Sequence, residues 1–522
     1  MTRPNPNSPT PTPAAGHNPN PRSPRTLALR RQLGWIVVAW MFGSLWMWTI
    51  SGAAMTQFAR GLGLPDWGFG LLAALPFIGT LFQLPASWVQ ERFGRRKAWF
   101  MTTLTLSRVL WITVALIPWI VPASWGGARW AVMLGMIGVS WIAGQMGTPA
   151  FMSWYSDLVP RRVRGRYTAQ RNTMTLPLAL VATVGVGWWL WSAEGAGASG
   201  EGAASADLLT IASLIIGFAG LAGTIDIVCF VWVRDPKPSR GHRDTDLRGL
   251  LLGPLKDRNF RRYLAYNFTL MLGLGFLGQY VWLFVFDGAG VSALEANLML
   301  VAVPMIIRAV AYPVWGRLVD RLGKKPVLLI AGGMFVFGPV GWLLVTPELI
   351  WPGYLLTCIS PLAWPGLEIA NFNFMLGMAE TRKGQRGGTA YVAVNSIVIG
   401  VGGALSGLMG GVIAGAIPGF RVEWVLDVPW LMGFEAGAAV VVTYHGVLFL
   451  VSMGFRVAAL IWASTLHEPR ATGTRDALRY MTAALYSNVR QGVLMPTRVV
   501  GRASQLSYRL RRRPVDRTTP PG

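Results

Sequence analysis

The sequence predicts an all-α polytopic membrane protein with twelve transmembrane helices in two six-helix bundles. Three observations support this fold class. Hydrophobic residues make up 52% of the 522 residues, charged residues make up only 13%, and long apolar runs alternate with short basic stretches. A soluble domain carries about 25% charged residues, so this chain has too few of them to cover a soluble globule of its length.

Twelve apolar runs are long enough to cross the hydrocarbon core of a bilayer, which takes about 20 residues of helix. We expect helices because a chain in lipid must satisfy its own backbone hydrogen bonds, and the alternation typical of barrel strands is absent. In the eleventh run, Gly403, Gly407, Gly411 and Gly415 recur every four positions, which predicts close packing against another helix. The predicted spans are residues 34–56, 67–89, 98–121, 127–152, 172–192, 208–233, 263–286, 292–315, 326–346, 350–378, 389–416 and 434–462.

Positive charge is distributed unevenly between the spans. Of the 47 Lys and Arg residues, 41 lie in the two tails and the even-numbered connections, three lie in the odd-numbered connections, and three lie within spans. Basic loops remain in the cytoplasm. We therefore expect both termini in the cytoplasm and an integral protein of the plasma membrane, which is the inner membrane in a bacterium. The same rule accounts for the net charge of +24 without a nucleic-acid partner.

The predicted domains follow from this pattern. A disordered tail of residues 1–33 precedes a first bundle (34–233), a basic linker (234–262), a second bundle (263–463) and a basic tail (464–522). In the last tail, apolar residues from Leu478 to Val489 recur at helical spacing. That spacing suits an amphipathic helix on the membrane surface, and a solvated basic tail held near anionic lipid is the alternative.

Two sequence patterns occur once in each bundle. Residues 91–96 read Glu-Arg-Phe-Gly-Arg-Arg, and residues 320–325 read Asp-Arg-Leu-Gly-Lys-Lys. A second pattern around the fourth span recurs around the tenth. The distance along the chain between the two copies is nearly the same for both patterns, which indicates a duplicated six-helix unit. The second pattern matches Trp141 to Trp364, Gln145 to Glu368 and Arg164 to Arg386.

With this repeat, the chain resembles the major facilitator superfamily of secondary transporters over roughly residues 34–462. Residues 316–325 look like the signature loop of that family, whereas the first-half copy has Ser87 in place of the Gly and Glu91 in place of the Asp. The resemblance implies that Glu91 and Asp320 act as cytoplasmic latches near the starts of the fifth and eleventh helices, because an acid gains from a helix N-terminus and from neighbouring bases. The expected gating residues are Glu91, Arg92, Gly94, Arg95, Arg96, Arg164, Gly316, Asp320, Arg321, Gly323, Lys324, Lys325 and Arg386.

The resemblance also implies that helices 1, 4, 7 and 10 line a central cavity. An ionisable residue inside a span costs at least about 2.5–3.5 kcal/mol and normally faces protein or water, which makes Glu368 of the tenth span the main candidate. Glu368 could exchange protons as its exposure alternates, or it could form a permanent ion pair with an Arg. The predicted substrate or coupling site comprises Glu368, Arg308, Gln145, Asn371, Trp141 and Trp364. Arg108 and Asp226 lie on peripheral helices, where a structural role is favoured over coupling.

The leading function is therefore secondary transport of a small solute by alternating access, with proton coupling as one possibility. A phosphate-binding loop for ATP is absent from the sequence, the four His residues show no metal-binding spacing, and we expect no cofactor, no metal and no enzymatic activity. The alternatives are a non-transporting receptor or assembly factor on the same scaffold and, less favoured, a membrane-embedded lipid-modifying enzyme. The expected partners are the small solute and the lipid bilayer, and we expect a monomer.

Overall fold

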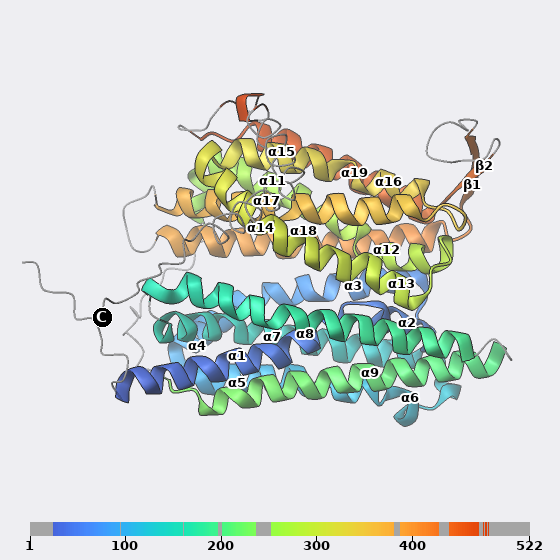
Figure 1. Ribbon diagram of the computed structural model, residues 1–522, viewed down its shortest axis with the longest axis horizontal. Coiled ribbons are helices and arrows are strands. Elements are labelled where there is room, and N and C mark those ends of the chain that lie inside the picture. Colours follow the sequence, from blue (N-terminus) through green and yellow to red (C-terminus); the bar gives the residue numbers. More distant parts are fainter. Residues whose placement is uncertain are drawn as a thin grey trace, which may run out of the picture.

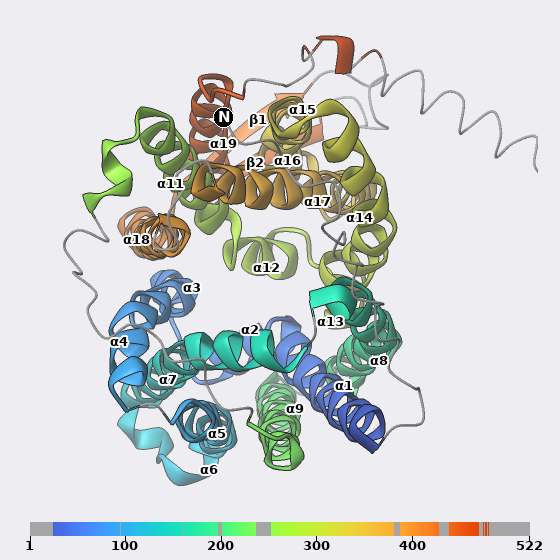
Figure 2. The same cartoon turned by 90° about the vertical axis from the view of Figure 1, so that its left-hand side faces the viewer.

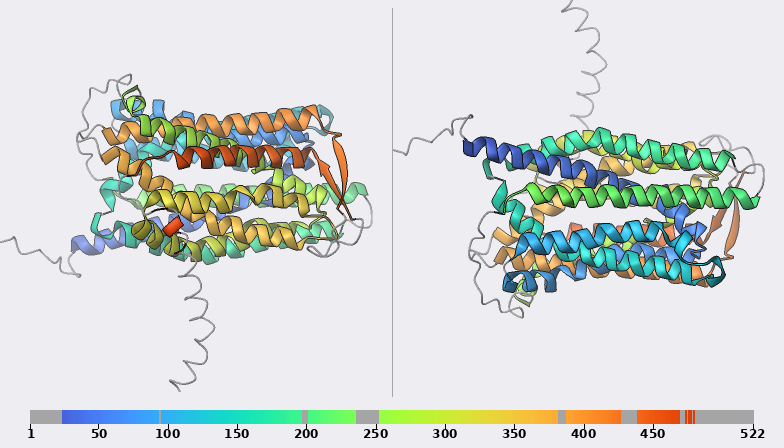
Figure 3. Two further views of the ribbon diagram at one scale, coloured as in Figure 1. Left: turned by 90° about the horizontal axis from the view of Figure 1, so that it is seen from above. Right: turned by 90° about the horizontal axis from the view of Figure 1, so that it is seen from below.

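The computed structural model is a bundle of long helices that run side by side in two halves (Figure 1). It describes residues 24–468 apart from 94, 160, 197–200, 236–251, 381–386 and 427–437, together with residues 473, 475–477 and 479. Seen end-on, the N-terminal half (α1 to α9) and the C-terminal half (α11 to α19) lie on opposite sides of the molecular centre (Figure 2). Most helices run nearly along one common axis (Figure 3).

The long helices of each half overlap the predicted spans, with differences at several ends. The N-terminal half consists of α1 (Pro24–Ile50), α2 (Ala53–Gly61), α3 (Asp66–Leu81), α4 (Gln83–Phe93), α5 (Arg96–Ala115), α6 (Ile117–Ile120), α7 (Ala128–Leu158), α8 (Arg161–Ala196) and α9 (Glu201–Cys229). The C-terminal half consists of α11 (Arg258–Leu277), α12 (Tyr280–Leu283), α13 (Ala293–Asn297), α14 (Val303–Leu322), α15 (Lys324–Val336), α16 (Gly338–Gly341), α17 (Trp351–Glu380), α18 (Gly387–Ala416), β1 (Arg421–Leu426), β2 (Ala438–Thr443) and α19 (Tyr444–Ser464).

The two halves repeat the same helix packing. Helix α1 packs against α9 as α11 packs against α19, and α5 packs against α7 as α15 packs against α17. The pair α3 and α7 has its counterpart in α14 and α17. This repetition agrees with the duplication indicated by the loop motif.

Eleven segments of the described residues are helical, long enough and apolar enough to cross a membrane. Helix α17, which coincides with the predicted tenth span, is not among them, although it has 30 residues. Its sequence contains Glu368, Asn371 and Asn373, and these polar residues lower its mean hydropathy. The structure therefore supports a polytopic helical membrane protein, and the count of twelve spans stays a prediction.

We name the two ends of the bundle by their connections. The basic end carries the α4–α5, α7–α8 and α14–α15 connections, and it lies on the left in Figure 1. Helices α2 and α13 and the strands β1 and β2 lie at the opposite end, on the right. Helix α1 begins at Pro24, inside the tail predicted to be disordered, while residues 1–23, most of the predicted linker and most of the C-terminal tail lie outside the described residues.

The predicted glycine ladder of α18 packs against α3 of the other half. A methyl group at Gly407 would lie 2.7 Å from the carbonyl oxygen of Gly70, and one at Gly411 would lie 2.6 Å from that of Trp67. At Gly403 a methyl group would collide with the Phe77 ring. Glycine is therefore required for the two backbones to approach this closely. The prediction of close helix packing is confirmed, and the contact joins the two halves.

The last predicted span, residues 434–462, is wrong at its start. Residues 438–443 form β2, which pairs antiparallel with β1 in a register that places Arg421 opposite Thr443. Helix α19 begins only at Tyr444. The run Ala-Ala-Val-Val-Val-Thr is rich in β-branched residues, which favour a strand, but its hydropathy alone resembles that of a membrane helix.

Candidate functional site

Polar side chains of α14 and α17 lie next to one another, midway along the two helices. Glu368 of α17 is exposed and accepts a hydrogen bond from the Tyr312 hydroxyl of α14. The Arg308 guanidinium, one turn before Tyr312, lies 5.9 Å from the centre of the Trp364 ring, within cation–π range. We call Arg308, Tyr312, Trp364 and Glu368 the α14–α17 group. Three of these four residues were predicted, and the structure brings them together.

Arg308 is close to Glu368 without forming an ion pair with it. Among the described residues, Arg308 has no salt bridge, and its buried Nε has no hydrogen-bond partner. The Tyr312 hydroxyl occupies the carboxylate instead. Of the two alternatives for Glu368, a fixed pair with this Arg is therefore not what this conformation contains.

Sequence reasoning missed Tyr312. Its signal was its position four residues after Arg308, which places both side chains on one face of a helix. A Tyr inside a lipid-crossing segment can bury its ring while its hydroxyl bonds a polar neighbour. Helix α17 contains Pro361 and Pro365 in its interior and still runs unbroken, so Glu368 projects from a continuous helix.

Asn371 bonds neighbouring helices in this structure. Its amide Nδ2 donates to Asn267 Oδ1 of α11 at 2.9 Å, and Asn267 Nδ2 donates to Asn395 Oδ1 of α18 at 2.9 Å. The Tyr263 hydroxyl donates to the carbonyl oxygen of Asn371 at 3.0 Å. This chain of amides ties three helices together inside the half, as interhelical amides do in membranes. A contact of Asn371 with solute stays a prediction.

The predicted residues of the N-terminal half lie apart from the α14–α17 group. Gln145 of α7 accepts a 2.5 Å hydrogen bond from Gln83 of α4, so its oxygen is engaged within its own half. The ring centres of Trp141 and Trp46 of α1 lie 6.2 Å apart. Within the described part of the chain, Gln145 and Glu368, its counterpart in the repeat, share no hydrogen bond.

Arg108 and Asp226 lie next to each other between α5 and α9. Their nearest charged atoms are 4.0 Å apart, and the Arg108 guanidinium lies 3.3 Å above the centre of the Trp46 ring. Gly43 of α1 leaves room for this pair, because a methyl group there would lie 2.7 Å from Asp226 Oδ2. A charge and an aromatic ring together compensate the buried guanidinium.

The C-terminal half has a charge of opposite sign at the equivalent place. In the repeat, Arg456 of α19 matches Asp226 of α9, and Gly273 of α11 matches Gly43 of α1 at the same separation along the chain. A methyl group at Gly273 would lie 2.8 Å from Arg456 Cγ. Arg456 donates to the carbonyl oxygen of Phe335 at 3.0 Å, an oxygen that the proline one turn later leaves without an intrahelical donor. The two halves therefore share the packing of a glycine against a charged side chain, but the charge is negative in the first half and positive in the second.

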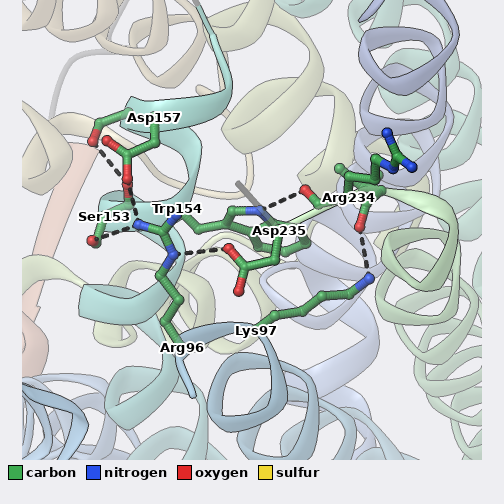
Figure 4. A network of polar contacts seen from close by, with 9 residues as sticks. Arg96, Lys97, Ser153, Trp154, Asp157, Arg234 and Asp235 are labelled. Carbon is green, nitrogen blue, oxygen red and sulfur yellow. Dashed lines mark hydrogen bonds and ion pairs between the residues drawn. The ribbon is translucent and has the colours of Figure 1, made fainter. Parts of the chain in front are cut away.

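At the basic end, Arg96 joins three segments of the N-terminal half (Figure 4). Its guanidinium contacts Asp157 at the end of α7 at 2.5 Å and Asp235 after α9 at 2.9 Å. The neighbouring Lys97 donates to the carbonyl oxygens of Val231 and Val233 at 2.9 and 2.6 Å. Arg96 is buried and its two partners are partly exposed. The predicted loop motif thus fastens α5 to α7 and to the segment after α9.

The second copy of the motif uses backbone groups instead. Glu468, after α19, accepts hydrogen bonds from the amide groups of Lys324 at 3.2 Å and Lys325 at 2.7 Å, at the start of α15, where a negative charge is favourable. Gly323 has φ of 95°, a conformation that favours glycine.

Of the two predicted latches, the structure describes the side chain of Asp320. It is exposed at the end of α14 and has no hydrogen bond or ion pair within the described part of the chain. Arg95, Gly316 and Arg321 lie near the same two connections without forming part of the α14–α17 group. Gly94 and Arg386, and the side chains of Glu91, Arg92 and Arg164, lie outside the described residues.

At the opposite end, polar contacts join the halves. Asn297 of α13 accepts from the Ala53 amide at 3.3 Å, and Glu194 of α8 accepts from the Ala293 amide at 3.1 Å. Further contacts of described residues at this end are Arg60 with Asp287, Gln279 with Thr56 at 3.2 Å, and Tyr444 with Asp66 at 2.6 Å. Together with the α3–α18 glycine contact, they join the two halves at this end of the bundle.

Comparison with known proteins agrees with this architecture. The model of the Major Facilitator Superfamily matches residues 37–407. Among solved structures, the nucleoside transporter NupG is similar with a TM-score of 0.58 and 11% identity, covering 85% of this chain and 100% of that one. A bacterial homolog of the human lysosomal transporter Spinster, solved in an inward-facing and unoccupied conformation, is similar with a TM-score of 0.54 and 15% identity, covering 84% of this chain and 95% of that one. No curated protein sequence matches the chain. Because the family model covers most of the sequence, this chain belongs to the Major Facilitator Superfamily.

Proposed function

We propose that this protein is a secondary transporter that moves a small polar solute across the plasma membrane by alternating access. The α14–α17 group would bind the solute and open to one side of the membrane and then to the other. One observation carries the proposal. Among the described residues, Glu368, Tyr312 and Arg308 place a carboxylate, a hydroxyl and a guanidinium without a salt bridge midway along α17 and α14. Ionisable groups inside a membrane are costly, so they usually mark a functional site. Twelve spans, with α17 as the tenth, and both termini in the cytoplasm complete the proposed topology.

In the proposed cycle, this conformation is the state in which the site opens toward the basic end. The halves are fastened at the opposite end, and Glu368 is exposed. If the basic end is cytoplasmic, this state is inward-open. In the alternate state, Asp320 and Glu91 would latch the basic end as the opposite end parts, which agrees with an Asp320 that is unengaged among the described residues here.

The chemistry of the α14–α17 group suggests the substrate class. Arg308 supplies donors for an anionic or oxygen-rich part of a solute, Glu368 accepts hydrogen bonds from hydroxyl or amino groups, and Trp364 offers a ring face for stacking. A polar solute with a planar ring combines these features. Nucleosides, for which the structurally similar transporter NupG is named, are therefore the first solutes to test. Glu368 would also serve as the coupling carboxylate if protons drive the transport.

The experiment measures solute binding to purified protein as a rise in its thermal unfolding temperature. We expect a polar, ring-bearing solute to stabilise wild-type protein, and Glu368→Gln and Arg308→Gln to abolish that rise. The matched control is Arg317→Gln, because Arg317 is an exposed arginine of the same helix whose Nε bonds the carbonyl oxygen of Pro313. Equal stabilisation of wild type and the Glu368 and Arg308 variants would refute the assigned site.

A further inference from the structure

Helix α2 begins at the interface between the halves without a capping side chain of its own. Helix α1 ends at Ile50 and α2 begins at Ala53, and the residue before α2 is Gly52, which has no side chain to accept a hydrogen bond. The first amide groups of a helix have no intrahelical partner. Here the Ala53 amide donates to Asn297 Oδ1 at 3.3 Å. Asn297 belongs to the other half and is only 2% exposed.

Helix α13 of the C-terminal half is in turn capped by a residue of the N-terminal half. Its own N-cap residue, Ser292, accepts a hydrogen bond from the Glu295 amide at 3.3 Å. The Ala293 amide, also in the first turn, needs a different acceptor. That amide donates to Glu194 Oε2 at 3.1 Å, and Glu194 comes from the end of α8 in the N-terminal half. Gln57 of α2 holds the other carboxylate oxygen of Glu194 at 3.3 Å. A carboxylate at a helix N-terminus also interacts favourably with the helix dipole.

Two glycines of the N-terminal half form the niche that admits Asn297. A methyl group at Gly52 would lie 2.9 Å from Asn297 Oδ1, and one at Gly187 would lie 3.1 Å from Asn297 Nδ2. A methyl group at Gly187 would also lie 3.0 Å from the backbone Cα of Leu294. Larger residues at either position would push α13 away from α8 and from the start of α2.

We propose that these two exchanged helix caps are the gate that holds the opposite end closed. Each half supplies an acceptor for the first amide group of a helix in the other half, so both of these hydrogen bonds exist only while the halves meet at this end. When the halves part, the two amide groups return to water. Removing a cap therefore destabilises the closed state and leaves the open state unchanged. This inference rests on the proposed alternating-access function and names the residues that set its conformational balance.

The size of the effect follows from known capping energies. Replacing a capping side chain by Ala changes the equilibrium between closed and open protein by roughly 2- to 30-fold, which is the range of measured cap losses converted to an equilibrium constant. One other polar contact at this end, an exposed ion pair, contributes less. The ion pair of Arg60 and Asp287 is 26% and 50% exposed, and exposed ion pairs contribute little.

The test measures the distance across the opposite end by electron spin resonance on full-length protein. Spin labels at Ser124→Cys, before α7, and Glu348→Cys, before α17, report on the two halves; both positions are exposed, and Cys229 and Cys358 are replaced by Ser. We expect a dominant short distance in the otherwise wild-type protein. Asn297→Ala and Glu194→Ala should each raise the ratio of long to short distances by about 2- to 30-fold.

Three further variants make the result decisive. Glu194→Gln keeps an acceptor oxygen and should restore most of the short-distance population, whereas Gly52→Ala should open the end by filling the niche. Glu295→Ala is the matched control, because it removes a carboxylate of α13 that bonds Tyr354 within the same half. Unchanged distances in Asn297→Ala and Glu194→Ala, or shifts no larger than that of Glu295→Ala, would overturn the gate. A distance shift in a protein that binds and moves no solute would leave the gate standing and refute the proposed function.

Discussion

The contact between α3 and α18 gives the sharpest prediction, because it joins the halves through backbone atoms. We consider the substitution Gly407→Ala. The new methyl group would lie 2.7 Å from the carbonyl oxygen of Gly70 and 2.8 Å from the amide nitrogen of Ala74. Neither atom can rotate away, since both belong to a helix backbone. Ordinary contact begins at 3.4 Å, so the two helices must part by about 0.7 Å.

The cost of this separation determines the expected effect. Inserting an extra methyl group into a well-packed interior costs about 1–3 kcal/mol. If the strain is relieved by parting the halves at the opposite end, the ratio of open to closed protein rises by about 5- to 140-fold. The substitution should also lower the temperature of thermal unfolding of the closed protein. The spin-label pair at positions 124 and 348 measures the ratio of open to closed protein. Intrinsic fluorescence during heating measures the unfolding temperature.

A matched substitution isolates the effect of the close contact. Gly454→Ala adds the same methyl group inside α19, where nothing lies within 4 Å. Alanine is more favourable than glycine in a helix by about 0.5–1 kcal/mol, so this variant should be at least as stable as wild type and keep its distances. If Gly407→Ala unfolds at or above the wild-type temperature with unchanged distances, the two helices are not packed this closely.

The remaining predictions concern polar and charged side chains of the two halves. Tyr312→Phe should weaken solute binding less than Glu368→Gln does, because the carboxylate remains and loses only one donor; equal losses in a binding titration would refute the assigned order. Arg96→Gln should lower the thermal unfolding temperature because it leaves two carboxylates without their guanidinium, whereas Arg95→Gln, at an exposed neighbour, should not; similar unfolding temperatures would contradict the network. Arg108→Gln should destabilise the protein more than Arg108→Gln combined with Asp226→Asn, and a fully additive pair of losses in a double-mutant cycle would mean that the two side chains are not coupled.

Much of the fold was predictable from the sequence because lipid imposes simple constraints. The loop motif after the second span and its repeat after the eighth indicated the duplication, and the helix neighbours of the two halves agree with it. The glycine ladder predicted a close helix contact, although only the structure identifies α3 of the other half as the partner. Hydropathy failed at residues 438–443, because an apolar β-branched run can pair as a strand just as it can cross a membrane.

The candidate site was less predictable because it depends on contacts between distant segments. Glu368 stood out as an acid in an apolar segment, but the repeat relates Gln145 to it as an equivalent position, and equivalence does not imply contact. The roles of Asn297 and Glu194 had no sequence signal, since each caps a helix of the other half. A capping pattern is readable from sequence only when the cap and the helix are adjacent in the chain.

Solute counterflow in liposomes tests the central claim most directly. Vesicles that contain the purified protein are loaded with an unlabelled solute that raises its unfolding temperature, and are then diluted into labelled solute without ATP or an ion gradient. Carriage by alternating access predicts a transient accumulation of label above the external concentration, lost in Glu368→Gln. Entry that only reaches equilibrium without an overshoot, or no protein-dependent entry for a solute that binds, would contradict it.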